Sequence, residues 1–324
     1  MTVSIALVTA RDALPLDEDM PPLASALAAL GARVDAPFWD DANVDWGRYD
    51  MAVLRSTWDY VERIDEFLDW ADRCSGLTRL LNTPQVVRWN TDKHYLVHLG
   101  RQGVPVVPTR FVEPGIDVDA QFAAFLAGGA GSTSTGEPTA FRDFVVKPSI
   151  GAGSRDAARY RREEADAALA HLRRLVGAER RSAMLQPYLD RVDDHGETAC
   201  VHFGGVYSHS FRKGPLLRAG SGLVKGLFAP EQITSRDPDD EERRVAAAAC
   251  AALPLAAPLY VRVDLIRDRE GQPVVLEVEM TEPSVYLLHA PGSADRFART
   301  ILANGTKRQN QPETNSRNTS ASKL

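Results

Sequence analysis

Three acidic residues in the last quarter of the chain have the types and spacing of a metal site. Glu277 and Glu279 stand two positions apart in an apolar run, and Asp264 lies in the apolar run before it. Residues two apart on a strand point to one face, and a neighbouring strand can add Asp264 to it. Three carboxylates on one face repel one another unless a cation lies among them, and oxygen-only ligands favour Mg²⁺ or Mn²⁺. A solvated strand edge carrying acids is the alternative, and the valines around these residues disfavour it.

A lysine followed by a glycine loop indicates a second kind of chemistry. Lys147 ends an apolar run, and Gly151, Ala152, Gly153 and Ser154 follow it closely. A loop that exposes backbone N–H groups beside a lysine is suited to binding phosphate oxygens. Only six of the 38 basic residues are lysines, so each lysine in the body of the chain is a candidate for a specific task.

The elements that must position these residues begin with alternating strand and helix patterns. In the first eighty residues we expect strands at 3–9, 33–37 and 51–55 and helices at 21–30 and 64–74. This alternation predicts a parallel, doubly wound sheet, which binds ligands beyond the carboxyl ends of its strands. Arg55 and Asp59 lie at such an end. A substrate-contact loop and a plain polar loop around a buried tryptophan are equally compatible with this stretch.

Further along, the patterns predict two more units that mix helices and strands. We expect helices at 92–102, 165–176 and 239–252, strands at 144–147, 183–186, 260–266 and 273–278, and a hairpin of 198–203 with 206–212. The expected domains are 1–84, 85–187 and 188–303, with a mobile glycine-rich loop at 128–139. Residues 304–324 are rich in asparagine and lack apolar periodicity, which predicts a disordered and non-native tail.

Composition excludes several classes of protein. The 38 basic and 44 acidic residues give a formal net charge of −6, which argues against a nucleic-acid partner. No apolar run approaches the length of a membrane span, and the start of the chain lacks the basic region of a signal peptide. The three cysteines are widely spaced, as in a reducing compartment. We therefore expect a cytoplasmic protein without a membrane partner, and its oligomeric state, homo-oligomer included, stays open.

Taken in order, these motifs resemble those of the ATP-grasp superfamily of carboxylate–amine ligases over residues 1–303. The order runs from Lys93 and the Lys147 loop through the stretches 185–189, 196–198, 212–213, 262–264 and 276–279. Each piece is weak alone, and the complete set in this order is specific. The resemblance implies an α/β protein with the ATP-grasp fold. An N-terminal doubly wound domain (pre-ATP-grasp) would precede two α+β lobes that enclose the nucleotide.

The resemblance also implies a role for each residue. ATP is the expected cofactor, with two Mg²⁺ or Mn²⁺ ions held by Asp264, Glu277 and Glu279. Arg262 and Lys213 would be catalytic, with Arg262 stabilising charge during transfer and Lys213 near the γ-phosphate. The nucleotide would be bound by Lys93, Lys147, Gly151, Gly153, Ser154, Gln186, Tyr188, Leu189 and Glu197.

One departure from the superfamily concerns the acceptor side. Many members have asparagine where Glu279 stands, followed by Ser/Thr-Pro-Gly, whereas this chain continues Met280, Thr281, Glu282, Pro283 and Ser284. With the stretch 55–60, this run most resembles the O-ureido-serine cyclo-ligases of D-cycloserine biosynthesis.

That resemblance implies a small amino-acid-like substrate. Its carboxylate would be activated as an acyl phosphate and closed to a ring, with release of ADP, phosphate, CO₂ and ammonia. Arg55, Asp59 and Ser284 are the substrate candidates. A ligase that joins a carboxylate to a separate amine and a non-catalytic nucleotide-binding module are the alternatives.

Overall fold

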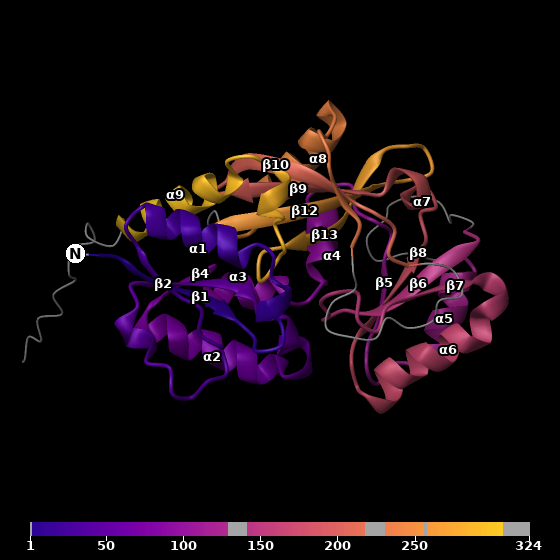
Figure 1. Ribbon diagram of the computed structural model, residues 1–324. Helices are drawn as coiled ribbons and strands as arrows, with labels where there is room; N and C mark the ends of the chain where they lie inside the picture. The colour runs from indigo at the N-terminus through magenta and orange to yellow at the C-terminus, as the bar shows by residue number, and fades with distance from the viewer. Residues whose placement is uncertain (1, 129–140, 218–230, 256–257, 307–324) are drawn as a thin grey trace, which may run out of the picture.

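The computed structural model describes residues 2–128, 141–217, 231–255 and 258–306. Three sheets organise this part of the chain, and each takes its strands from one successive stretch of sequence. Figure 1 shows the N-terminal sheet at one end of the molecule and the other two sheets beside and above it. The domain boundaries predicted at 84 and 187 fall between these stretches and stay a prediction.

The N-terminal sheet is parallel and has the strand order β2-β1-β3-β4. Its strands are β1 (Ser4–Thr9), β2 (Arg33–Asp35), β3 (Met51–Ser56) and β4 (Arg79–Leu81). Its helices are α1 (Met20–Ala29), α2 (Ile64–Leu77) and α3 (Pro84–Asn90). Every residue of β1 and β3 is buried, because helices cover both faces of a parallel sheet. The expected doubly wound unit is confirmed.

The central sheet is antiparallel, with the order β5-β8-β6-β7. Its strands are β5 (Arg110–Val112), β6 (Asp143–Pro148), β7 (Ala158–Arg161) and β8 (Ala183–Pro187). The helices of this stretch are α4 (Tyr95–Arg101), α5 (Val118–Leu126) and α6 (Ala165–Arg173). Strand β6 carries Lys147 close to its end, and the glycine loop follows directly.

The third sheet has the order β11-β10-β9-β12-β13. Its strands are β9 (Glu197–Phe203), β10 (Val206–Lys213), β11 (Ile233–Ser235), β12 (Tyr260–Arg267) and β13 (Pro273–Glu279), and its helices are α7 (Val192–His195), α8 (Asp240–Ala251) and α9 (Ser293–Thr306). Gly204 and Gly205 join β9 to β10 with φ of +58° and +83°, the pair that a tight hairpin turn of this hand requires. Asp239 caps α8, accepting hydrogen bonds from the backbone N–H groups of Glu241 and Glu242.

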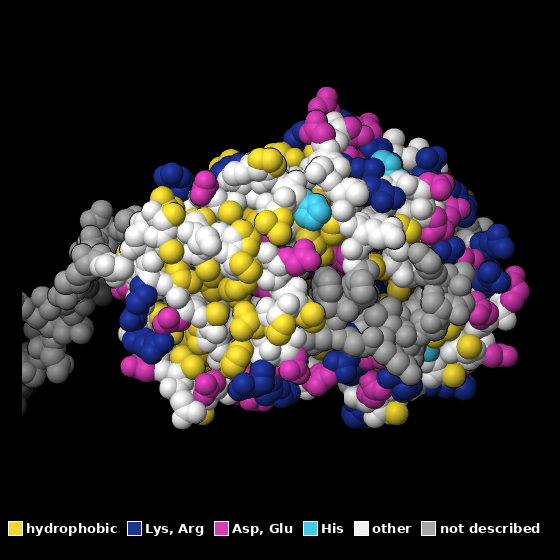
Figure 2. Space-filling model, viewed as in Figure 1, with side chains coloured by type: hydrophobic (Ala, Val, Ile, Leu, Met, Phe, Trp, Pro, Cys, Tyr) yellow, Lys and Arg dark blue, Asp and Glu magenta, His cyan; other side chains and the backbone are white. Residues whose placement is uncertain are grey.

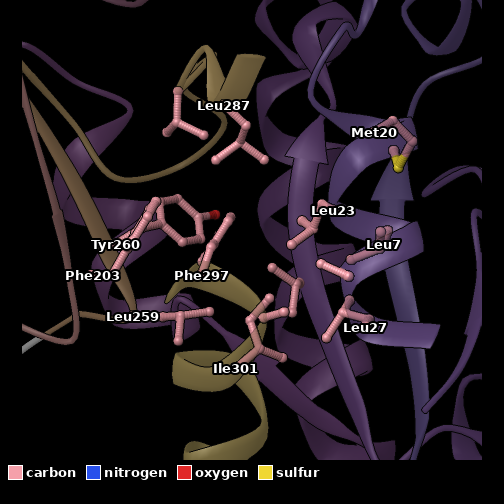
Figure 3. Close-up of a cluster of buried hydrophobic side chains, with 14 of the residues drawn as sticks. Leu7, Met20, Leu23, Leu27, Phe203, Leu259, Tyr260, Leu287, Phe297 and Ile301 are labelled. Carbon is pink, nitrogen blue, oxygen red and sulfur yellow. The ribbon is translucent and has the colours of Figure 1, made fainter. Parts of the chain in front are cut away.

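Helix α9 returns to the start of the chain and packs against α1. Figure 3 shows the cluster between them, with Leu23 and Leu27 facing Phe297 and Ile301. Phe297 also stacks on Phe203 of β9, with ring centroids 4.3 Å apart. The last helix therefore joins the N-terminal unit to the third sheet through one hydrophobic core.

Two expected boundaries differ from the structure. The helix expected at 92–102 begins only at Tyr95, because Asp92 accepts the N–H of His94 in a turn, and the separate helix α3 precedes it. Helix α9 continues to Thr306, so residues 304–306 belong to a helix and not to the tail. The remainder of the tail and almost all of the expected glycine-rich loop lie outside the described residues.

The surface carries both signs of charge. On the face shown in Figure 2, Lys and Arg side chains alternate with Asp and Glu around the rim, and hydrophobic side chains gather over the N-terminal unit and α9. Among the described helices, none combines the length and hydropathy needed to cross a membrane.

Candidate active site

One pocket collects residues from the central and third sheets, from the loops between them, and from η3 (Trp58–Glu62) and α3 of the N-terminal stretch. Fourteen of the candidate site residues line it: Lys93, Lys147, Gly151, Gly153, Ser154, Gln186, Tyr188, Leu189, Glu197, Lys213, Arg262, Glu277, Glu279 and Ser284. Asp264, Arg55 and Asp59 do not. The order of motifs along the chain thus corresponds to a shared location in space.

Two lysines enter the pocket in different electrostatic states. Lys93 lies 2.9 Å from a carboxylate oxygen of Glu277 and donates a hydrogen bond to the carbonyl of Gly151 at 2.7 Å. Burial would lower the pKa of Lys93, but Glu277, together with Glu279 and Glu282, raises it overall. Lys147 has no ion pair among the described residues, and burial lowers its pKa. An anion entering the pocket therefore finds Lys147 as the cation whose charge is not already compensated.

The acidic triplet is assembled by strand register. Asp264 of β12 pairs with Glu277 of β13, and Arg262 pairs with Glu279. The expected sharing of one face across the ladder is thus present. Asp264 is completely buried beneath this face, whereas Glu277 and Glu279 remain partly exposed to the pocket.

A buried network surrounds Asp264. Lys213 donates to its Oδ2 at 2.9 Å, and Arg262 binds both of its oxygens at 2.8 Å. Burial would raise the pKa of Asp264, but Arg262 and Lys213 lower it to about 2. Lys213 also lies 2.8 Å from Glu197, its partner across β9 and β10, and Arg262 also donates to Glu279. Asp264 therefore fixes the positions of both predicted catalytic cations.

The donors for a metal ion are of the right type but are paired with protein cations. Among the residues that the structure describes, no three His, Cys, Asp or Glu side chains are arranged as a metal site. Glu277 is held by Lys93 and Glu279 by Arg262. Burial raises the pKa of Glu279 to about 7, despite Arg262. Carboxylate oxygens fit a hard divalent cation, which would compensate this crowded negative charge.

The stretch 186–189, which the resemblance assigns to nucleotide binding, is held in place by neighbouring residues. Tyr188 donates its backbone N–H to the carbonyl of Asp143 at 2.9 Å, and the guanidinium of Arg159 lies 3.5 Å from the centre of its ring. The side chain of Gln186 donates to Thr109 at 2.8 Å, and Gln186, Tyr188 and Leu189 all line the pocket. In the glycine loop, Gly153 and Ser154 both have positive φ, near 60°.

Two of the three substrate candidates lie elsewhere. Arg55 is 1% exposed, with its Nη2 3.4 Å from Asp19 and 3.2 Å from the carbonyl of Pro283. Asp59 accepts from Trp39 at 2.8 Å and pairs with Arg63 at 2.9 Å. The structure therefore does not bring Arg55 and Asp59 into the pocket with the other candidate residues, and their contact with substrate stays a prediction. Ser284 lines the pocket, and its carbonyl accepts from Arg262 at 2.8 Å.

The sequence reasoning missed a patch of the pocket wall that joins two distant segments. Trp58 and Tyr60 lie in the short 3-10 helix η3 (Trp58–Glu62), and both line the pocket with Glu282. Trp58 donates its indole N–H to the backbone carbonyl of Glu282 at 3.0 Å, and the Tyr60 hydroxyl hydrogen-bonds its side chain. Burial, with Glu279 nearby, raises the pKa of Glu282 to about 8. The sequence reasoning also missed Glu231, which lines the pocket. For Glu231 and Glu282 the sequence offered one signal, namely that each is an acidic residue near the other motifs.

Comparison with known proteins identifies the family. Residues 5–82 match the family described as D-cycloserine synthetase DcsG, N-terminal domain. The chain is also 43% identical over 302 residues to the cycloserine biosynthesis protein DcsG of Streptomyces lavendulae, covering 92% of this chain and 97% of that protein. The chain belongs to the D-cycloserine synthetase family. It is thus an enzyme, an ATP-dependent ligase, as the order of its motifs predicted.

Solved structures agree with this membership. The crystal structure of D-cycloserine synthetase DcsG matches with a TM-score of 0.85 and 42% identity, covering 93% of this chain and 99% of that chain. The D-alanine–D-alanine ligase of Bacillus anthracis complexed with ATP matches with a TM-score of 0.63 at 14% identity, covering 95% of this chain and 98% of that chain. The ATP-grasp ligase PsnB with Mg and ADP matches at 0.59 and 15%, covering 93% and 98%. The two distant likenesses concern the fold alone, and they show that this chain shares the architecture of ATP-grasp ligases.

Proposed function

We propose that this chain is an ATP-dependent cyclo-ligase that converts O-ureido-D-serine to D-cycloserine. The observation that carries the proposal is its 43% identity, over nearly the whole of both chains, to a cycloserine biosynthesis protein. The pocket supports it, because phosphate-binding cations and acids for a metal ion lie beside a wall that could receive a small amino acid.

The reaction begins with activation of the substrate carboxylate, which is a poor electrophile. A carboxylate oxygen attacks the γ-phosphorus of ATP, and the bond from that phosphorus to the bridging oxygen breaks. The products of this step are ADP and the acyl phosphate. Lys147 and Lys93 would bind the phosphate chain and Lys213 the transferred group, while Arg262 stabilises the developing charge. Glu277 and Glu279, with Asp264 beneath them, would hold a divalent ion, which would neutralise charge on the phosphates.

Ring closure follows within the same substrate. The nitrogen bonded to the side-chain oxygen attacks the activated carbonyl carbon and expels phosphate, which closes a five-membered ring. The carbamoyl group on that nitrogen leaves as CO₂ and ammonia, with one water consumed. The loop 151–154 would act as a lid that excludes water from the acyl phosphate before closure. Gln186, Tyr188 and Leu189 would hold the base through their backbone, and Glu197 the ribose hydroxyls.

The test is an assay of the purified chain with ATP, Mg²⁺ and O-ureido-D-serine as the sole amine. We expect ADP, ammonia and the cyclic product in equal amounts. The L-isomer tests stereochemistry, and replacing Mg²⁺ by Mn²⁺ tests metal preference. ADP release that requires a second amino acid would instead favour the ligase that joins two molecules, and no turnover with any amine would favour the nucleotide-binding module.

A further inference from the structure

The acids of the pocket differ in whether a protein cation accompanies them. Lys213 lies 2.8 Å from Glu197 and 3.8 Å from Glu231. Glu277 is paired with Lys93 and Glu279 with Arg262. Within the described ranges, Glu282 alone among these pocket-lining acids has no lysine, arginine or histidine nitrogen within 4 Å.

The surroundings of Glu282 hold its carboxyl group in one place. The residue is 8% exposed, and what remains exposed faces the pocket. The Trp58 indole fixes its backbone carbonyl, and the Tyr60 hydroxyl binds its side chain. These two aromatic residues belong to the N-terminal unit, more than two hundred positions away in sequence. A carboxylate so positioned and so little hydrated is costly to keep charged unless a cation joins it.

We propose that Glu282 binds the ammonium group of the amino-acid substrate, with Tyr60 as its positioning residue. The inference rests on the proposed function, because the cation is the α-ammonium of O-ureido-D-serine. Tyr60 supplies one hydrogen bond to this side chain, and a carboxylate can accept several, so oxygen lone pairs remain for the ligand. Among the described residues of the pocket, Lys147 is a cation without an ion-pair partner, and Glu282 is an acid without one. The phosphates of the nucleotide would pair with Lys147, and the ammonium group of the substrate would pair with Glu282. Glu282 thus replaces Asp59 as the acidic candidate for contact with the substrate.

The test compares O-ureido-D-serine with 3-(ureidooxy)propanoate, which has the same atoms except the amino group. We expect the wild-type enzyme to prefer the amino acid by roughly 30-fold or more in kcat/KM. Glu282→Gln keeps the size of the side chain and removes its charge. This variant should raise KM for the amino acid, change kcat/KM for the analogue by less than about threefold, and leave KM for ATP unchanged, which brings the preference close to one.

Two further variants make the result decisive. Tyr60→Phe should lower the preference by a smaller factor, and it carries the same comparison if Glu282→Gln fails to fold. Glu231→Gln is the matched control, since that acid already has Lys213 and should leave the preference intact.

Wild-type enzyme without turnover of O-ureido-D-serine would overturn the proposed function itself. Active wild-type enzyme with an undiminished preference in both Glu282→Gln and Tyr60→Phe would overturn the role of Glu282 alone. A changed Mg²⁺ requirement at constant preference would also overturn it.

Discussion

Asp19 and Arg55 form a buried ion pair that anchors the loop following β13 to the N-terminal unit. The Asp19 carboxylate also accepts the backbone N–H groups of Val285, Tyr286 and Leu287, at 2.7, 3.0 and 2.6 Å. Arg55 adds a bond to the carbonyl of Pro283. The same loop supplies the carbonyl of Ser284 to Arg262, so the N-terminal unit supports a predicted catalytic residue from a distance.

Replacing Asp19 tests this anchor. Asp19→Ala should lower the free energy of unfolding by about 3–5 kcal/mol, because it leaves Arg55 buried without its anion and three N–H groups without an acceptor. Urea titration measures the loss, and kcat should fall as Arg262 loses its support. Asp35→Ala, which removes a pair half exposed to solvent, is the control and should cost less than about 1 kcal/mol. Equal losses in the two variants would contradict the anchor.

Lys147 and Lys93 offer a comparison of an uncompensated and a compensated cation. Lys147→Met should raise the free energy of unfolding by about 1 kcal/mol, because it removes a charge that has no described partner. Lys93→Met should lower it by about 3 kcal/mol, because Glu277 is then left unpaired. Calorimetric titration should show ATP binding weakened roughly 10- to 100-fold in both. A Lys147→Met protein that binds ATP normally would exclude the phosphate role.

Glu277→Gln tests the metal site. We expect ADP release to fall at least about 100-fold, since the amide holds a divalent cation poorly and a bound ion is needed to neutralise the phosphates. The far-ultraviolet circular dichroism should be unchanged. Titrating Mg²⁺ against the nucleotide complex should show weaker metal binding. Retained activity at ordinary Mg²⁺ concentrations would refute the assignment of Glu277.

Two buried histidines predict how stability depends on pH. Burial lowers the pKa of His209 and of His171 to about 4, and His209 lies 2.7 Å from the carbonyl of Val285. In the unfolded chain a histidine has a pKa of about 6.5, so below that pH the unfolded state binds more protons than the folded state. The contribution of these two histidines to stability should therefore be complete above about pH 6.5 and be lost as the pH decreases toward 4, whereas Glu279 and Glu282, whose pKa values burial raises, act in the opposite direction. Each histidine contributes up to about 3 kcal/mol to that loss.

Urea titrations at pH 7.5, 6 and 5 measure this dependence. The free energy of unfolding of wild type relative to His209→Gln should decrease as the pH falls, since glutamine can also hydrogen-bond a carbonyl but does not titrate. A difference between the two proteins that is constant with pH would remove His209 from the explanation.

The sequence could predict the parts of the site that depend on local pattern. Lys147 with its glycine loop, the spacing of Glu277 and Glu279, and the hairpin at Gly204 each follow from neighbours in the chain. Helix α3 was missed although Pro84 at its first turn is a recognised signal, because the helix has only seven residues. Local pattern is therefore informative where an element is long or its turn chemistry is strict.

The remainder depended on contacts between distant segments. Arg55 follows a strand at the sheet edge where ligands usually bind, and only the position of Asp19 shows that its charge is used internally. Glu282 stands just beyond the expected metal motif, and its surroundings come from Trp58 and Tyr60. No periodicity or spacing encodes such pairings, because they are created when the chain folds.

The packing of α9 on α1 has a consequence for synthesis on the ribosome. The apolar face of α1, with Leu23 and Leu27, is covered in part by Phe297 and Ile301, which are among the last described residues to be made. During synthesis, part of the hydrophobic surface of the N-terminal unit therefore stays uncovered until nearly the whole polypeptide has been translated. A chain released from a ribosome that stalls before α9 emerges keeps this hydrophobic surface exposed and is prone to aggregate.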